Sequence, residues 1–296
     1  MSWLAWVLAS AILYSVVELF DKFVTDHEIK NYQIASIMCG IPIYLFFMAY
    51  GLISGSPLIP VTVAGVSVLL GSLYTFSLFS YYTGLSEEDV TRFIPTLSLN
   101  TVIVVILSFM ILGESYDLVT YAGIASVVVG TLLISIENPR KTLRNFQSTR
   151  ALHLGLITAF IGAVSSIVLK VLTNTAALES ILFWEGIGGI ISIIPLIYVN
   201  RTEFTLEDLN GYRDLTIIGF LTSTAYLAFA KSITLGPVSL TSTLLKINSI
   251  FIFFGATIIS RLHPEIIHEE LDTRILAQKI ISILLIIAGV AAIKLI

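Results

Sequence analysis

A lysine and an asparagine interrupt an apolar run in the last fifth of the chain. The stretch TSTLLKINSIFIFF (241–254) places Lys246 and Asn248 among more than twenty residues without another charge. An ammonium group at the centre of a bilayer costs roughly 2.5 to 3.5 kcal/mol on insertion scales, so such a group usually faces a cavity or a partner. Lys246 therefore has two interpretations: it attracts an anionic or carboxylate-bearing substrate in a wet cavity, or it belongs to a buried ion pair that holds helices together.

Glu185 is the predicted partner of Lys246. It lies in FWEGIGGIISIIP (183–195) and enters its apolar run from the same membrane face, about 7 or 8 Å deep against about 12 Å for Lys246. The pair is either a lock that substrate or a proton breaks, or static neutralisation. Lys231, about one turn from the end of its run, is interpreted as an interfacial lysine whose ammonium reaches the membrane surface.

Glu18 is the second candidate for a proton- or ion-linked carboxylate. The stretch VVELFDKF (16–23) places it four residues before Lys22, a spacing that favours an ion pair on one helix face. That pair is the structural interpretation. Glu18 also lies one turn deeper than Asp21 and Lys22, which favours a role inside the membrane.

Two amides and several aromatic residues complete the candidate binding residues. Asn100 and Asn248 each lie inside an apolar run, where an amide needs a hydrogen-bond partner across the bundle, so helix association and substrate contact both remain open. Tyr82 and Tyr226 are candidate cavity walls. A belt of aromatic residues at the membrane interface is the alternative.

The composition dictates what must position these residues. The chain of 296 residues is 56% hydrophobic and 12% charged, with a mean hydropathy of +0.94, whereas soluble domains carry about 25% charged residues. It is a membrane protein by composition. The net charge of −4 and the lack of a basic tail argue against nucleic acid as a partner, and the single Cys39 excludes an intramolecular disulfide.

Apolar runs of about 18 to 23 residues recur along the whole chain, and each is long enough to cross a hydrocarbon layer of about 30 Å. The first, SWLAWVLASAILYSVV, has no basic segment before it and is interpreted as a span rather than a secretory signal. Twelve of the sixteen Lys and Arg lie on the side of the odd-numbered loops, a bias that favours termini outside the cell. We predict ten spans, near 3–23, 32–54, 61–83, 92–112, 116–136, 152–172, 180–200, 215–234, 238–260 and 275–296.

A shift of 148 residues aligns the two halves of the chain. Lys22 then lies over Lys170, and Asn100 over Asn248. Because each copy has five spans, the second must cross the membrane in the opposite sense to the first, as in many secondary transporters. The predicted fold is thus an all-α integral membrane protein of ten transmembrane helices in two inverted five-helix repeats: residues 1–137, a polar connection at 138–151, and residues 152–296.

The order of the motifs resembles the drug/metabolite transporter superfamily, EamA type. The resemblance rests on residues 79–135, from FSYYTGLSEEDV through MILGESYD, and on YLAFAKSITLGPVSLTSTLLKIN (226–248) in the second half. Two departures stand out: Asn100 and Asn248 replace the family's proline, and the second half lacks the Gly-Glu found at Gly113 and Glu114. The resemblance implies a transporter with a central cavity lined by spans 1–4 and 6–9, with spans 5 and 10 as peripheral support. Relatives with cytoplasmic termini oppose the orientation that the charge bias favours.

These observations predict a secondary-active transporter in the cell membrane that moves a small metabolite, amino-acid-like or an organic anion, by alternating access with proton coupling or exchange. A sugar-phosphate or nucleotide-sugar exchanger is the first alternative, since LLKIN is similar to the ninth span of those proteins. The second is a non-transporting or enzymatic membrane protein, for which HPEIIHEELD (263–272) offers no defensible zinc spacing. We expect no catalytic residue, cofactor or metal, with lipid and a small molecule as partners and a monomeric or homodimeric state.

Overall fold

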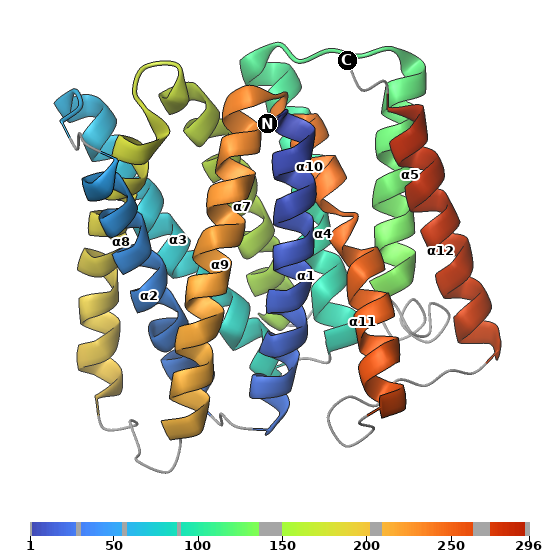
Figure 1. The fold of residues 1–296 in the computed structure, drawn as a ribbon, viewed down its shortest axis with the longest axis horizontal. Helices are drawn as coiled ribbons and strands as arrows, with labels where there is room; N and C mark the ends of the chain where they lie inside the picture. Colours follow the sequence, from blue (N-terminus) through green and yellow to red (C-terminus); the bar gives the residue numbers. More distant parts are fainter. Residues whose placement is uncertain are drawn as a thin grey trace.

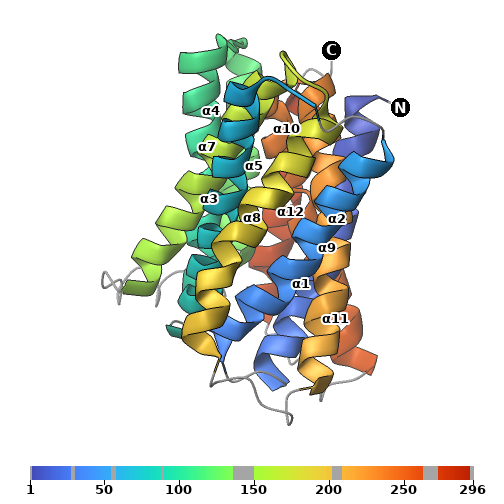
Figure 2. The ribbon, with the colours of Figure 1, turned by 90° about the vertical axis from the view of Figure 1, so that its left-hand side faces the viewer.

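The computed structural model describes residues 2–27, 31–54, 58–87, 90–135, 150–201, 209–262 and 273–293, and this part of the chain contains helices and no strands. The helices run roughly parallel to one another in a single bundle (Figures 1 and 2). Their bounds are α1 Trp3–His27, α2 Tyr32–Ile53, α3 Val61–Glu87, α4 Val90–Leu107, the π-helix η1 Ser108–Leu112, α5 Leu118–Ser135, α7 Arg150–Thr173, α8 Leu178–Asn200, α9 Leu209–Leu235, α10 Val238–Leu245, α11 Asn248–Leu262 and α12 Thr273–Ala292.

Nine stretches of the described chain are long and apolar enough to cross a membrane. They correspond to nine of the predicted spans. The remaining prediction, near 92–112, falls on α4 and η1, whose apolar part Thr96–Leu112 is shorter. A hydrocarbon core of about 30 Å accepts helices of about 17 residues or more, so this part can also reach across the layer.

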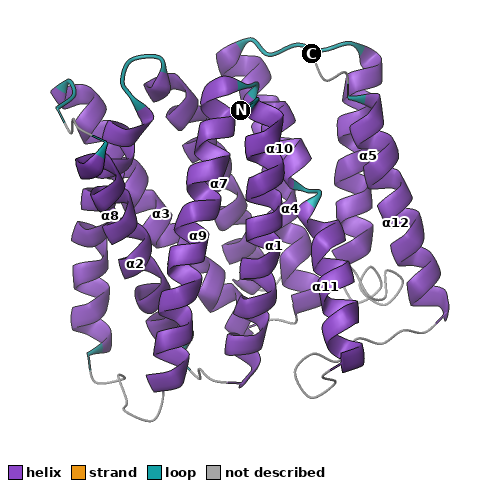
Figure 3. Cartoon of the chain, viewed as in Figure 1, coloured by secondary structure: helices purple, strands orange, loops and turns teal. Residues whose placement is uncertain are grey.

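The predicted ninth span is not one continuous helix. It consists of α10 and α11, which are separated by Lys246 and Ile247 (Figure 3). Around this break the backbone amides of Lys246, Ile247, Ser249 and Ile250 donate to carbonyls three residues earlier, at 2.9–3.2 Å, rather than four. The predicted span near 238–260 is confirmed by the apolar stretch Val238–Leu262, but the sequence did not indicate the break, because no glycine or proline marks it.

Helices of the two halves of the chain pack directly on each other. The contacts join α1 to α9, α2 to both α8 and α9, α3 to both α7 and α8, α4 to α7, and α5 to α12. The last pair stands at one edge of the bundle (Figure 1). The largest hydrophobic core lies among α2, α3, α8 and α9, where Tyr44, Phe47 and Ile181 are fully buried.

A glycine allows α8 to approach α3 closely. A Cβ atom added at Gly188 would lie 2.0 Å from the carbonyl oxygen of Val68. The same helix brings Gly186 and Gly189 against Tyr44 of α2. The small residues of FWEGIGGIIS therefore serve helix packing.

We expect Gly188→Ala to destabilise the protein by about 1 to 3 kcal/mol, because the added methyl group overlaps backbone that cannot move away cheaply. The measurement is thermal unfolding of the purified protein in detergent. Gly65→Ala is the matched control, since a Cβ atom there meets nothing within 4 Å. An equal melting temperature for Gly188→Ala and wild type would contradict the close approach of α3 and α8.

Candidate substrate-binding cavity

A cavity of about 240 Å³ lies among the helices where the two halves meet. Its lining comes from α1, α2, α3, α4, α5, α7, α9 and the break between α10 and α11. The sequence-based expectation differs at two helices. α5, expected to be peripheral, contributes Thr131 and Ser135, and α8 contributes no lining residue. The reason is that α8 packs tightly behind α2 and α3, one layer away from the cavity.

Lys246 lines this cavity from the helix break. It is the C-cap of α10 and is half-buried. Its ammonium interacts electrostatically with the carboxylate of Glu18, but within the described residues it makes no hydrogen bond and no ion pair within 4 Å. A cation inside a membrane helix, beside a cavity and without a close protein partner, is placed to bind an anion.

Glu18 and Asn248 lie next to Lys246 and are bonded to each other. The side-chain amide of Asn248 donates to Glu18 Oε1 at 2.8 Å, which joins α11 to α1. The amide oxygen Oδ1 of Asn248 is buried and has no hydrogen-bond partner within the described chain. Both residues also line the cavity. The predicted ion pair of Glu18 with Lys22 has no counterpart to compare in the structure, because the Lys22 side chain lies outside the described part.

Asp21 and Tyr14 are lining residues that the sequence analysis did not select. The Tyr82 hydroxyl, a predicted candidate, donates to Asp21 Oδ1 at 2.8 Å, and both residues face the cavity. Tyr14, Glu18 and Asp21 are spaced i, i+4, i+7 and so share one face of α1. In the sequence, this spacing was the feature that could have identified Tyr14 and Asp21 as neighbours of Glu18.

Glu185 does not pair with Lys246, so that prediction was wrong. Its side chain is 1% exposed, and its Oε1 accepts a hydrogen bond from the Tyr226 hydroxyl at 2.9 Å. The other carboxylate oxygen has no partner in the described structure. Counting residues along a span predicts how deep a side chain lies in the membrane, but it does not predict the direction in which that face of the helix points.

Tyr226 packs against other aromatic rings and is not among the residues that line the cavity. Its ring centroid lies 5.1 Å from that of Phe47 and 5.6 Å from that of Tyr74. Only Tyr74 of these three reaches the cavity. The three rings, together with Glu185, form a buried layer that we call the aromatic layer.

Asn100, the counterpart of Asn248 in the repeat, serves helix association. Its side-chain amide donates to the Ala159 carbonyl at 2.9 Å and so connects α4 to α7. It is absent from the cavity lining, although its neighbours Leu97 and Ser98 contribute to it. Lys231 has cation–π contacts with Trp6 and Tyr50, at 5.0 and 5.5 Å from the ring centroids.

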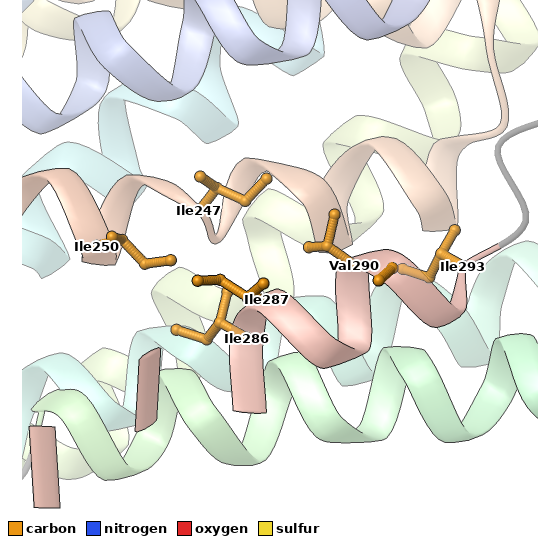
Figure 4. Close-up of a pocket in the computed structure, with 7 residues that line it drawn as sticks. Ile247, Ile250, Ile286, Ile287, Val290 and Ile293 are labelled. Carbon is orange, nitrogen blue, oxygen red and sulfur yellow. The ribbon is translucent and has the colours of Figure 1, made fainter. Parts of the chain in front are cut away.

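A larger hollow, of about 500 Å³, is a groove between α11 and α12 (Figure 4). Its lining is aliphatic throughout: Ile247 of the helix break, Ile250 of α11, and Ile286, Ile287, Val290, Ala291 and Ile293 at α12. Such a groove offers no group that could select a polar molecule. The segment 263–272, considered for a metal, lies outside the described residues, and those described contain no cluster of three or more His, Cys, Asp or Glu.

Comparison with known proteins finds a family that matches the first part of the chain. Residues 1–136 match the EamA-like transporter family. The resemblance drawn from the sequence is confirmed over those residues, and this EamA-like match supports a general role in membrane transport. No curated protein matches the chain.

Solved structures share the fold over the whole chain. Twenty-nine chains of known structure match, among them a crystal structure with 15% sequence identity and a TM-score of 0.68. The match covers 99% of this chain and 96% of the other. At this identity the likeness establishes the arrangement of helices and nothing about the molecule transported.

We expect Tyr226→Phe to destabilise the protein by about 1 to 3 kcal/mol, because it removes the hydrogen bond to a buried carboxylate. The double variant Glu185→Leu/Tyr226→Phe removes both partners and should recover most of the loss. Thermal unfolding of the two variants and the wild type in detergent measures their order of stability. A double variant less stable than Tyr226→Phe alone would contradict the buried hydrogen bond between Tyr226 and Glu185.

Proposed function

We propose that the protein is a secondary-active transporter that moves a small organic anion or an amino-acid-like zwitterion across the cell membrane by alternating access. One observation carries the proposal. Lys246 stands at a break in a membrane helix, lines a cavity at the seam of the two halves, and has no hydrogen-bond partner for its ammonium in the described structure. Broken helices that present charge at mid-membrane are typical of secondary transporters.

The packing of the helices supports a ten-span inverted repeat. Exchange of α1 to α5 with α7 to α12, taken in order and with α10 and α11 as one span, turns the contact of α1 with α9 into that of α7 with α3. It likewise turns the contact of α3 with α8 into that of α9 with α2, and leaves the pairs α2·α8 and α5·α12 unchanged. α1 and α7 run in opposite directions (Figure 1), as two oppositely oriented copies require.

The charges of the cavity favour a substrate that is anionic at one end and carries a donor at the other. Lys246 would take a carboxylate. Glu18 and Asp21 would accept hydrogen bonds from an ammonium or hydroxyl group on the same molecule. A volume of about 240 Å³ lies below the usual 300–1,000 Å³ of drug-sized pockets, which favours a small metabolite.

A phosphate-carrying substrate fits these residues less well. A sugar-phosphate exchanger would need several cations at the binding site, whereas the charged lining residues other than Lys246 are the acids Glu18 and Asp21. The sequence also contains no P-loop pattern, so the proposal relies on a gradient or on exchange rather than on ATP.

Alternating access requires the cavity to open to one side at a time. The aromatic layer of Phe47, Tyr74, Tyr226 and Glu185 is the proposed barrier, since it is densely packed and borders the cavity at Tyr74. Because helices of both halves interleave, we infer that each moving unit combines helices from both halves, rather than one half rocking as a whole.

A ligand screen tests the role of Lys246. We expect amino acids or organic acids, tested beside sugars and nucleobases, to raise the melting temperature of the wild type, since a ligand at about 100 times its Kd stabilises the folded state by about 2.7 kcal/mol. Lys246→Met should lose this shift. Lys231→Met, which removes a lysine outside the cavity, is the matched control and should keep it. A shift shared by all three proteins would count against Lys246 as the recognition group.

Uptake into liposomes tests the coupling. With the stabilising compound as labelled substrate, we expect an imposed pH gradient or unlabelled compound on the opposite side to change the initial rate severalfold. Lys246→Met should reduce uptake to the level of empty liposomes, while Lys231→Met transports. Uptake that responds neither to the pH gradient nor to unlabelled compound would leave only facilitated diffusion and would contradict the coupled mechanism.

A further inference from the structure

Glu114 binds the N-terminus of α10 from the opposite half of the chain. The backbone amide of Val238 donates to its Oε1 at 2.7 Å and that of Ser239 to its Oε2 at 3.1 Å, and the Ser239 hydroxyl also donates to Oε2. The first amides of a helix have no partner within the helix, and a carboxylate there is favoured by the helix dipole as well. Pro237, the N-cap, has no capping side chain, so Glu114 takes this role.

The neighbouring residues hold the Glu114 carboxylate in place. Gly113 ends η1 in the left-handed conformation, with φ of 70°, and so turns the chain towards α10. The Tyr116 hydroxyl lies 3.1 Å from Glu114 Oε2 and 2.9 Å from the Ser239 hydroxyl. A phenol has an ordinary pKa of about 10, so the Tyr116 hydroxyl is protonated and can donate at neutral pH.

Lys170 binds the other end of the turn that joins α9 to α10. Its ammonium donates to the carbonyls of Ile233 at 2.8 Å, Gly236 at 3.0 Å and Thr234 at 3.3 Å, at the C-terminus of α9. Cations are favoured there for the same electrostatic reason that acids are favoured at an N-terminus. The turn between α9 and α10 is thus fixed by a cation on one helix end and an anion on the other.

α10 connects the end that Glu114 binds to Lys246 at the other end. It has eight residues, about 12 Å at 1.5 Å per residue, and Val238 to Leu244 are all buried. Lys246 follows at its other end. Beyond the break, α11 is tied separately to α1 by the bond between Asn248 and Glu18. Lys246 therefore stands between two independently anchored half-helices.

We propose that Glu114 is a positioning residue that sets the place of Lys246 in the cavity by anchoring α10. The proposal rests on the function proposed for Lys246. A merely structural role would loosen the whole cavity, whereas a positioning role moves residue 246 and leaves lining residues on other helices where they are.

Thiol labelling separates these two outcomes. Residue 246 becomes the reporter in the variant Cys39→Ser/Lys246→Cys, and the probe is the anionic reagent 2-sulfonatoethyl methanethiosulfonate. Addition of Glu114→Gln should raise the labelling rate at residue 246 at least fivefold, because the freed α10 opens the break. The reference reporter is Cys39→Ser/Ser77→Cys, which lines the same cavity from α3; its rate should stay within twofold.

Two further variants complete the test. Glu87→Gln removes the carboxylate of a surface ion pair with Arg150, 3.1 Å away, and should change neither rate. Ser239→Ala removes one of the three hydrogen bonds that α10 donates to Glu114, and should raise the rate at residue 246 at least twofold even if Glu114→Gln does not fold. An unchanged rate at residue 246, or an equal rise at both reporters, would overturn the proposal. Because labelling needs no substrate, this result is independent of the ligand screen, which alone decides the role of Lys246 in recognition.

Discussion

An ammonium group within the hydrocarbon layer is the constraint on which the rest of this structure depends. A charge at that depth costs several kcal/mol unless water or a counter-charge is near. The chain meets the requirement by interrupting the ninth predicted span at Lys246 and Ile247, so that the lysine lies at a cavity rather than against lipid. The counter-charge of Glu18 comes from the first helix of the opposite half.

The polar groups near this cation also determine which helices are joined. Asn248 joins α11 to α1, and Tyr82 joins α3 to α1, in each case through an acid of α1. No water is available in the bilayer core to satisfy a lost partner, so each of these bonds fixes an orientation as well as a contact. α1 is consequently the helix around which the cavity is organised, with three acidic or phenolic lining residues on one face.

Some helices of the bundle are closely packed, whereas others border the cavity. α8 is held against α2 and α3 by backbone contacts at its glycines and contributes no lining residue. α10 and α11 are short half-helices with separate anchors, at Glu114 and at Glu18. The glycine-packed helices are therefore the closely packed part of the bundle, whereas the broken span is held at two separate points.

The sequence by itself determined the apolar spans and the identity of the charges within them, because these depend on run length and composition along one dimension. It selected Lys246, Asn248, Glu18 and Tyr82, all of which line the cavity. Only the tertiary structure decided which carboxylate faces the lysine. Glu185 and Glu18 both lie within apolar spans, and the choice between them depends on the rotation of each helix about its axis. That rotation is fixed by contacts with helices of the other half, such as α8 on α3, which no single segment encodes. The sequence did not indicate the break at Lys246 for a related reason. The two residues of the break have side chains that also occur in helices, and the flanking half-helices are bonded to Glu114 and Glu18, which lie 132 and 228 residues before Lys246.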